Sequence, residues 1–391
     1  MVRLTVRTCP LGLKIYTERM RIGIDAKWYF TGPVSTQVVL QNLLPELFSA
    51  FPGHEWIIFL DKKDRQLDFP HQAKNIRVEY VWADNNMLSN VFVLPRYVRR
   101  LKPDVMVYQT FPGLHGGTGS VAFIHDVLFR DFPQFFSWKE RLYFLPLAPL
   151  TRRASRVVAT TGYVAERLVK HHYVHNRSQV DLVPLGVNPV YGPASRHDKA
   201  WLEQVRHKFR LPGRYLLYVG RLNVRKNIEN LLRSLPLLND TAIPLVIAGK
   251  EDSVAPDLER LLADTRIRER IILTGGMSNE ELVATYAMAH VFCFPSLAEG
   301  FGLPPLEAMA SGIPVVVSNT TSLPEVCGDA AVYIDPSSPA GIAAGLNSLL
   351  DNPSLYEEKK KQGLRRVDSF PWKDSAEALM QSIANAANKK L

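Results

Sequence analysis

The sequence predicts an α/β protein built from two doubly wound parallel sheets. Short apolar and β-branched runs alternate with helix-length segments along nearly the whole chain. Strands this short and apolar are typical of parallel sheets whose two faces are both covered by helices. The alternation runs for about six strands, breaks over residues 186–214 and then resumes. A chain of 391 residues also divides into two or three domains on the usual scale of about 100–200 residues each.

The predicted elements follow one another at regular intervals. Strands in the first half are expected at 21–25, 56–60, 76–80, 105–108, 121–124, 157–160 and 180–183. Strands in the second half are expected at 215–219, 245–248, 271–274, 291–294, 315–318 and 332–334. Helices are expected between them, for example at 36–50, 227–235, 279–289 and 340–350.

The break between the two strand series is rich in proline and glycine, which places a linker near 188–196. A Phe-Pro-Trp sequence at 370–372 interrupts the chain before a last helix at 373–388. The expected divisions are an N-terminal extension at 1–19, a first domain at 20–188, a second domain at 189–372, and a C-terminal helix at 373–391 that crosses back to the first domain.

The composition is that of a globular protein, with 46% apolar and 22% charged residues. The sequence contains no uncharged apolar run of about 18 residues, so no transmembrane helix is expected. Four cations interrupt the first nineteen residues, which argues against a signal peptide and leaves Met20 as an alternative start. Three cysteines without a C-x-x-C pair indicate a reducing compartment. The expected location is the cytoplasm, with the inner face of the membrane as an alternative.

The net charge of +9 lies entirely in the first half of the chain. Residues 1–190 hold 24 Lys and Arg against 15 Asp and Glu, whereas residues 191–391 hold 23 of each kind. A basic half favours anionic partners such as nucleic acid, an acidic membrane surface or a phosphorylated acceptor. A generic solubilising surface is the alternative, and no nucleic-acid-binding motif is present.

The first chemical motif is the segment YVGRLNVRKN at 218–227. A predicted strand ends at Gly220, and Arg221 and Lys226 flank the short loop that follows. A helix is expected to begin at Asn227. Ligands of open α/β sheets bind beyond the carboxyl ends of the strands, and two cations beside a helix N-terminus suit a pyrophosphate. Fixed cations at the oxygen of a departing diphosphate would stabilise the transition state; an exposed basic loop is the alternative.

The second motif is EGFGLPPLE at 299–307, which follows the predicted strand at 291–294. Gly300 and Gly302 permit a tight loop whose backbone amides can face a ligand. Glu299 precedes this loop and Glu307 lies in the predicted helix, so the two carboxylates can serve different parts of one extended ligand. Carboxylates suit vicinal hydroxyls because each oxygen accepts hydrogen bonds. The alternative is a helix-capping Glu299 and a solvated Glu307.

The third motif lies in the first half, where a predicted strand ends directly at His125 and Asp126. A histidine at a strand end is as consistent with a functional role as with a structural one. The sequence contains no D-x-D triplet, which metal-dependent nucleotide-sugar enzymes usually need to hold the ion. No metal site is therefore expected.

Together these segments resemble the family 4 retaining glycosyltransferases of GT-B fold, the glycosyl transferases group 1. The likeness covers nearly the whole chain from Arg21 onward and is carried by an ordered set of motifs. They are GIDAKW at 23–28, the HD pair at 125–126, VPLGVN at 183–188, YVGRLNVRKN at 218–227, LTGGMSNEEL at 273–282, the E-x7-E pair at 299 and 307, and SLPEVCGDAAVYIDP at 322–336. The resemblance implies two Rossmann-like domains that face each other across a cleft.

The resemblance also implies a role for each matching residue. Arg221 and Lys226 are expected to hold the donor diphosphate, Glu299 to contact the donor sugar, Glu307 to bind the ribose hydroxyls, and His125 to lie beside the anomeric carbon. The implied catalytic residues are His125, Arg221, Lys226 and Glu299. The implied donor-binding residues are Gly32, Gly220, Arg221, Lys226, Gly275, Met277, Glu299, Gly300, Phe301, Gly302, Leu303 and Glu307. The implied reaction retains the anomeric configuration and assigns no protein nucleophile, metal or other cofactor.

The loop after the first strand departs from the family pattern. Many members have a glycine pair there, whereas this chain has Gly32 followed by Pro33, which has no N–H to donate to a phosphate. The amide of Val34 or the side chain of Ser35 is the expected substitute. In the other half, the loop at 275–278 is expected near the base of the donor.

The expected function is transfer of a hexose from UDP-glucose, UDP-galactose or GDP-mannose to a saccharide or lipid-linked acceptor, in polysaccharide or glycolipid biosynthesis. The basic segments at 96–102 and 141–156 add an expected peripheral contact with an anionic membrane, with amphipathic surface helices as the alternative. Two other functions stay open at this point. One is a phosphorylase or epimerase of the same fold, and the other is a basic nucleic-acid-binding protein.

Overall fold

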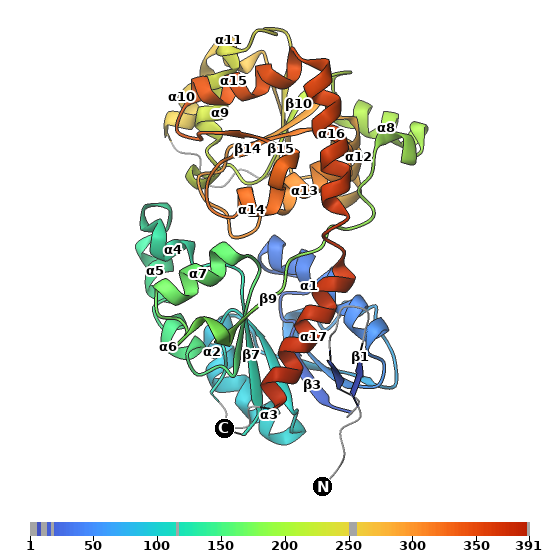
Figure 1. Ribbon diagram of the computed structural model, residues 1–391, viewed down its shortest axis with the longest axis vertical. Helices are drawn as coiled ribbons and strands as arrows, with labels where there is room; N and C mark the ends of the chain where they lie inside the picture. The colour runs from blue at the N-terminus through green and yellow to red at the C-terminus, as the bar shows by residue number, and fades with distance from the viewer. Residues whose placement is uncertain (1–5, 9–13, 17–18, 115–116, 250–255, 389–391) are drawn as a thin grey trace. The chain divides into compact units, whose positions relative to one another are not determined.

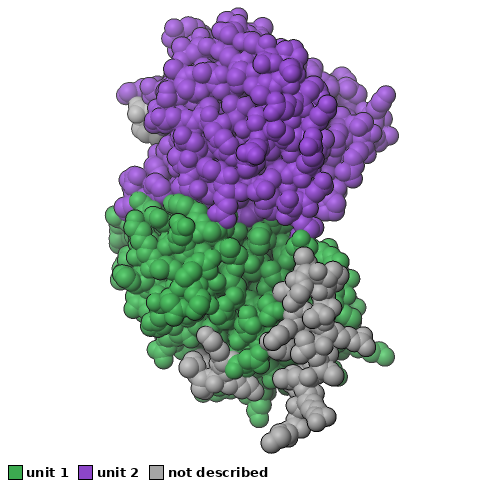
Figure 2. Space-filling view, in the orientation of Figure 1, with its two compact units in different colours: residues 1–131, 136–186, 372–391 green, residues 132–135, 187–371 purple. Residues whose placement is uncertain are grey.

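The computed structural model describes residues 6–8, 14–16, 19–114, 117–249 and 256–388. The chain forms two compact units, coloured separately in Figure 2. Unit 1 comprises Met1–Asp131, Phe136–Gly186 and Trp372–Leu391, and unit 2 comprises Phe132–Phe135 and Val187–Pro371. Apart from the short segment Phe132–Phe135, the chain changes unit after Gly186 and after Pro371, within two residues of the divisions expected after 188 and 372.

Unit 1 is built on a parallel sheet whose strand order is β5-β4-β3-β6-β7-β8-β9. Its strands are β3 (Arg21–Asp25), β4 (Glu55–Asp61), β5 (Ile76–Val81), β6 (Val105–Gln109), β7 (Gly119–Ile124), β8 (Arg156–Ala159) and β9 (Val180–Leu182). Each described pair of neighbours is parallel. The central strands β6 and β7 are buried along their whole length, as expected for a sheet covered on both faces.

Helices cover both faces of this sheet (Figure 1). They include α1 (Val34–Ala50), α3 (Leu94–Leu101), α7 (Gly162–Lys170) and α17 (Trp372–Asn388). The last helix packs against α1 and against strands β7 and β8. Ser375 of α17 donates to the carbonyl of Pro184 at 2.6 Å. A Cβ on Gly186 would lie 2.5 Å from the ring of Trp372, so this close approach requires glycine.

Unit 2 repeats the architecture with the strand order β12-β11-β10-β13-β14-β15. Its strands are β10 (Leu216–Val219), β11 (Leu245–Ala248), β12 (Ile271–Gly275), β13 (Val291–Phe294), β14 (Val315–Ser318) and β15 (Ala331–Ile334), and all described pairs are parallel. The order reverses between β10 and β13, as it does between β3 and β6 in unit 1. Such switch points are where open α/β sheets bind ligands, beyond the carboxyl ends of the strands.

In the sequence, the helices of unit 2 precede, connect or follow these strands. They include α8 (Lys199–Phe209), α9 (Ile228–Ser234), α12 (Asn279–Met288), α13 (Leu303–Ala310), α14 (Leu323–Cys327), α15 (Pro339–Leu350) and α16 (Pro353–Val367). The predicted α/β class with two parallel sheets is confirmed. Among the described residues, no helix has both the length and the apolar composition that crossing a membrane requires.

Two helices and one strand pair depart from the expectations. The break expected over 186–214 contains helix α8, which begins where the Asp198 side chain accepts from the amide of Trp201 at 2.8 Å. Helix α16 was not predicted, and it begins at a similar cap on Asn352. The region expected to be a plain extension holds a two-stranded antiparallel pair, β1 (Val6–Thr8) with β2 (Lys14–Tyr16). Of the cysteines, Cys293 and Cys327 are free and buried, and Cys9 lies outside the described residues.

Candidate functional site

The centre of the candidate site in unit 2 is an ion pair between Lys226 and Glu299. The Nζ atom of Lys226 lies 2.6 Å from Oε1 of Glu299, and the two side chains are only 13% and 10% exposed. They are 73 residues apart in sequence, and they meet because β10 and β13 are neighbours whose carboxyl ends share one edge of the sheet. The Lys226 ammonium also lies 4.6 Å from the ring centroid of Phe294, the last residue of β13. The structure thus brings together two of the residues predicted from different motifs.

Arg225 joins this pair and was missed by the sequence analysis. Its Nη1 atom donates to the carbonyl of Ala298 at 2.6 Å and to Oε2 of Glu299 at 3.2 Å. Its own carbonyl accepts from the amide of Leu297 at 2.9 Å. Arg225 therefore fastens the loop after β10 to the loop after β13 through both its side chain and its backbone. The feature of the sequence that could have indicated Arg225 is its position directly before Lys226.

A short 3-10 turn, Val224–Lys226, gives the two cations their position. The Asn223 side chain accepts from the Lys226 amide at 3.1 Å and starts the turn. Asn227 ends it in the left-handed region, with φ of 58°, so α9 begins at Ile228 and not at Asn227 as predicted. The Asn227 side chain donates to the carbonyls of Pro295 at 2.9 Å and Pro336 at 2.7 Å. Asparagine tolerates this conformation better than most residues, and these two tertiary bonds hold it there.

The loop that carries Glu299 is fixed from the following strand connection. Thr321, with φ of 56°, places its hydroxyl to accept from the amide of Glu299 at 3.0 Å. Ser322 donates to the carbonyls of Glu299 at 2.9 Å and Phe301 at 3.0 Å. The Ser296 hydroxyl donates to Oε1 of Glu299 at 2.5 Å. A left-handed threonine is a sparsely populated conformation of the kind found at functional sites.

The charges of the pair follow from this environment. Burial alone would raise the pKa of Glu299, but Lys226 and Arg225 outweigh burial and lower that pKa to about 2. Burial lowers the pKa of Lys226, Glu299 opposes this effect, and Arg225 and Arg221 add to it. Glu299 is therefore ionised at neutral pH. Lys226 and Arg225 both contact this one carboxylate, and Arg221 acts on Lys226, which leaves this corner of unit 2 with an excess of positive charge suited to a diphosphate.

The remaining predicted residues of the 218–227 and 299–307 motifs line the same strand ends. Arg221 follows β10 and is exposed. Gly300, Phe301 and Gly302 are buried and lead into α13, which begins at Leu303, with Gly302 at φ of 105°. The first amides of a helix have no carbonyl partner within it, so the Leu303 end of α13 offers donors to an anion.

The glycines at the ends of three adjacent strands approach one another closely. The Gly220 amide bonds the Ala248 carbonyl at 3.0 Å, and the Gly249 amide bonds the Gly275 carbonyl at 3.1 Å. A Cβ on Gly249 would lie 2.0 Å from the carbonyl oxygen of Gly220, so no side chain fits there. Gly249 was not predicted as a site residue. Met277 follows this region, and its sulfur accepts from Thr285 at 3.4 Å.

Glu307 lies on α13, in a different setting from Glu299. Its Oε2 accepts from the hydroxyl of Tyr286 at 3.0 Å, and the Tyr191 hydroxyl bonds it as well. Burial raises the pKa of Glu307 to about 7, although both hydroxyl bonds act to lower it. Glu307 is only partly exposed and is held by two hydroxyl groups, so it is not a freely solvated surface carboxylate.

In unit 1, His125 follows β7 and bonds to Gln109, the last residue of β6. Its Nε2 lies within hydrogen-bond distance of Oε1 of Gln109, at 3.1 Å. Burial lowers the pKa of His125 to about 4, so the ring is neutral at neutral pH. Asp126 accepts from the amide of Leu128 at 3.1 Å. Gln109 was missed because the strand was expected to end one residue earlier.

A second buried cluster in unit 1 also went unnoticed. Lys27, whose side chain is fully buried, bonds Oδ1 of Asp25 at 2.6 Å and also bonds Asn90. Asn90 donates in turn to Oδ2 of Asp25 at 2.9 Å and to the carbonyl of Phe111 at 2.7 Å. Asn90 lies in a π-helical turn, Ser89–Val93. The cluster ties the end of β3 to this turn.

The loop after β3 keeps a glycine for a steric reason. Gly32 has φ of 116°, and a Cβ there would lie 2.5 Å from the indole of Trp28. Its carbonyl accepts from Gln37 at 2.7 Å. Pro33 is the N-cap of α1, so Val34 and Ser35 occupy the first turn of that helix. Backbone amides of a first turn lack helical partners, and these two residues are the ones expected to replace the missing N–H of Pro33 as donors to a phosphate.

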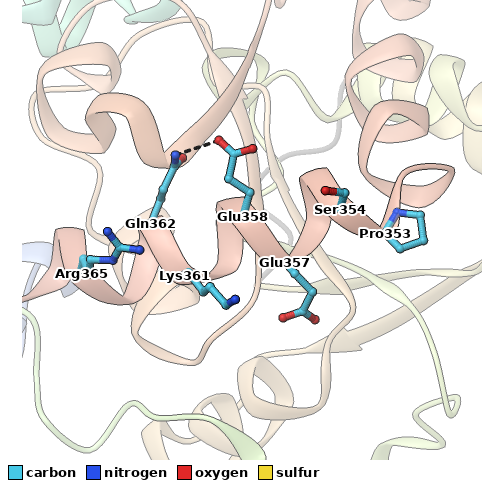
Figure 3. Close-up of a pocket in the computed structure, with 7 residues that line it drawn as sticks. All are labelled: Pro353, Ser354, Glu357, Glu358, Lys361, Gln362 and Arg365. Carbon is cyan, nitrogen blue, oxygen red and sulfur yellow. Dashed lines mark hydrogen bonds between the residues drawn. The ribbon is translucent and has the colours of Figure 1, made fainter.

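A surface hollow elsewhere in unit 2 does not compete with this site. It is lined by residues of α16 alone, and Figure 3 shows them along one side of that helix. They are Pro353, Ser354, Glu357, Glu358, Lys361, Gln362 and Arg365. Gln362 donates to Glu358 at 2.9 Å, an i, i+4 pair typical of a solvated helix face. Within the described part of the chain, no three or more His, Cys, Asp or Glu residues form a group that could hold a metal ion.

Two family models match the chain, one on each half. The model described as Glycosyltransferase Family 4 matches residues 36–191, and the model described as Glycosyl transferases group 1 matches residues 200–366. The chain belongs to the family 4 glycosyltransferases. The predicted family is thus confirmed. The second match contains the Lys226–Glu299 pair and Glu307, and the first contains His125.

Curated relatives of this glycosyltransferase include bacterial mannosyltransferases. It is 34% identical over 227 residues to the O-antigen chain mannosyltransferase B of Escherichia coli, covering 56% of this chain and 55% of that one. It is 35% identical over 190 residues to a serotype-specific mannosyltransferase WbdA of Escherichia coli, covering 46% of this chain and 23% of that one. The matches span about half the length of the first relative and about a quarter of the second.

Solved structures share the fold of this glycosyltransferase over almost its full length. Sucrose-phosphate synthase from Thermosynechococcus elongatus superposes with a TM-score of 0.72 and 20% identity, covering 93% of this chain and 97% of that chain. Anabaena HepE in complex with UDP-glucose superposes with a TM-score of 0.72 and 15% identity, covering 94% of this chain and all of that chain. The predicted GT-B fold is confirmed by these likenesses together with the two parallel sheets.

Proposed function

We propose that this chain transfers a hexose from a nucleotide-diphosphate sugar to a saccharide or lipid-linked acceptor, in polysaccharide or glycolipid biosynthesis. The observation that carries the proposal is the Lys226–Glu299 pair at the switch point of unit 2, with Arg225 and Arg221 beside it. A diphosphate bound there would lie near the cationic side chains of Lys226, Arg225 and Arg221. The donor sugar would lie near the ionised carboxylate of Glu299. Two relatives are named as O-antigen chain mannosyltransferases, which supports a hexose donor and a polysaccharide product.

The proposed chemistry retains the anomeric configuration and uses no metal. The bond between the anomeric carbon and the diphosphate oxygen breaks while the acceptor hydroxyl oxygen bonds the same carbon from the same face. The acceptor proton passes to the departing diphosphate oxygen, so charge and atoms balance. Negative charge builds on the diphosphate as the bond breaks, and Lys226 and Arg221 would stabilise it more in the transition state than before. Such fixed cations supply the charge that a divalent ion supplies in other transferases.

Donor binding can be measured before any acceptor is known. We expect one nucleotide-diphosphate sugar among UDP-glucose, UDP-galactose and GDP-mannose to raise the melting temperature clearly. A ligand at about 100 times its Kd stabilises the native state by about 2.7 kcal/mol. Free sugars and nucleoside monophosphates, which lack the diphosphate, serve as controls and should give much smaller shifts. Shifts with duplex or single-stranded nucleic acid and none with any nucleotide sugar would overturn the proposal.

Peripheral contact with an anionic membrane remains a prediction, and it now rests on one of the two candidate segments. The segment at 96–102 belongs to α3, which buries Val98 and Leu101 in unit 1. In the segment at 141–156, Leu142 and Leu145 are 59% and 63% exposed beside Arg141. Just before this segment, Trp138 at the start of helix α5 (Trp138–Tyr143) is 64% exposed beside Lys139. Flotation with anionic but not neutral vesicles would support the contact, and its absence with both would remove it.

A further inference from the structure

The carboxylate of Glu307 is held from two sides by tyrosine hydroxyls that belong to different elements of unit 2. Tyr286 lies on α12, is fully buried, and donates to Oε2 of Glu307 at 3.0 Å. Tyr191 lies in the segment that enters unit 2 from Gly186, and its hydroxyl bonds Glu307 too. The two rings meet edge to face with centroids 5.6 Å apart. Neither tyrosine belongs to the motifs that carried the sequence analysis.

From this arrangement we infer that Tyr191 and Tyr286 are positioning residues that aim the Glu307 carboxylate at the ribose of the donor nucleotide. The inference rests on the proposed function, because it takes the ligand of Glu307 to be a ribonucleotide. A carboxylate has about four lone-pair positions. Two phenol donors leave acceptor positions for the vicinal 2′ and 3′ hydroxyls of a ribose. The two hydrogen bonds also fix the plane of the carboxylate. Without them, the carboxylate would rotate freely about the last bond of the side chain.

The same hydroxyls act on the ionisation of Glu307. Burial raises its pKa to about 7, and the hydrogen bonds from Tyr286 and Tyr191 oppose that rise because they stabilise the charged form. No other described titratable group is among the causes of this shift. The ionised form accepts from both ribose hydroxyls, so ribose binding should strengthen as the pH rises through about 7. Loss of either hydroxyl should move that midpoint to higher pH.

Tyr191 also connects this carboxylate to the crossing between the units. Its amide bonds the carbonyl of Asn188 at 3.1 Å, and one residue earlier Val187 bonds the carbonyl of Phe370 at 2.8 Å. Val187 is the first residue of the long segment of unit 2, and Phe370 lies one residue before the end of that segment.

The test compares nucleotides with and without ribose hydroxyls on the full chain. Calorimetry would give the Kd of UDP and GDP and of their 2′,3′-dideoxy analogues for the wild type and for Tyr191→Phe and Tyr286→Phe. Hydrogen bonds to a charged group are each worth roughly tenfold or more in affinity, so the wild type should discriminate against the dideoxy form by at least about tenfold. Each phenylalanine variant should lose about threefold or more of this discrimination at pH 7. Part of the loss should return at pH 9, where Glu307 is ionised in every variant.

A matched control separates positioning from folding. Tyr356→Phe removes a comparable hydrogen bond, from the Tyr356 hydroxyl to the carbonyl of His290 at 3.1 Å, elsewhere in unit 2. It should leave the discrimination unchanged. Unchanged discrimination in both Tyr191→Phe and Tyr286→Phe would overturn the inference while leaving the proposed function standing. A wild type that binds neither nucleoside diphosphate would instead overturn the proposed function, and the inference with it.

Discussion

Replacing Lys226 by methionine should lower the rate of nucleoside diphosphate release from the donor by about a hundredfold or more. Methionine keeps an apolar side chain of similar length over the ring of Phe294, so the main change is the loss of the ammonium group. Removing one donor that stabilises a developing negative charge costs about a hundredfold to a thousandfold in other enzymes. Arg221→Ala should have a similar effect without disturbing the fold, because Arg221 is exposed.

Lys208→Met is the matched control for the loss of a lysine charge in unit 2. Lys208 pairs with Glu281 at the surface and is 63% exposed, so its removal should change the rate by less than about twofold, as surface ion pairs contribute little. Melting temperatures would show whether Lys226→Met is folded. Near-normal rates in both Lys226→Met and Arg221→Ala would contradict the role assigned to these cations.

Glu299→Gln should lower turnover by about a hundredfold while leaving the binding of the nucleoside diphosphate intact or tighter. Glutamine keeps the shape of the side chain and can still bond Ser296, but it no longer neutralises Lys226 and Arg225. The donor sugar loses a charged acceptor, and hydrogen bonds to charged groups are worth about 1.5–3 kcal/mol. The diphosphate meets one negative charge fewer, so its affinity should not fall.

This split between turnover and nucleotide affinity distinguishes a functional from a structural role. With a pKa of about 2, Glu299 is ionised across the working range, so the effect should not depend on pH between about 5 and 9. Glu281→Gln, which removes the carboxylate that pairs with Lys208 and caps α12, is the control. Parallel loss of nucleotide binding and turnover in Glu299→Gln would indicate that the loop had collapsed, against the proposed role.

The sheets could be predicted from sequence because their strands are buried on both faces. Strand β13, for example, was expected at the residues where it lies, and all four of them are buried. Helix α16 gave no such signal, since it buries only Gly363 completely and carries charged residues around most of its surface. Helix α8 was hidden by the prolines and glycines on either side of it, although its Asp198 cap was visible.

The motifs predicted individual residues of the site, but they did not predict the contacts between residues of different motifs. Lys226 and Glu299 were both expected at strand ends, but their direct pairing depends on the neighbouring positions of β10 and β13 in the sheet. The left-handed turn at Asn227 depends on the carbonyls of Pro295 and Pro336, which lie 68 and 109 residues away. Contacts of this kind are made by the tertiary fold, and local pattern does not reveal them.

The tyrosines around Glu307 illustrate the same limit. Tyr286 is 21 residues from Glu307 and lies on another helix, and Tyr191 belongs to the segment that was expected to be a linker. Neither position has a recognisable spacing relative to the E-x7-E pair. Only the packing of α12 and the entering segment against α13 brings the three side chains together.

We propose that fixed cations of unit 2, and not a divalent ion, neutralise the departing diphosphate. The most direct measurement is the rate of nucleoside diphosphate release from the best donor, with the enzyme first stripped by EDTA and then supplied with Mg²⁺ or Mn²⁺. We expect the stripped enzyme to retain its full rate and the added ions to change it by less than about twofold. A stripped enzyme that stays inactive until Mg²⁺ or Mn²⁺ is supplied would contradict the claim.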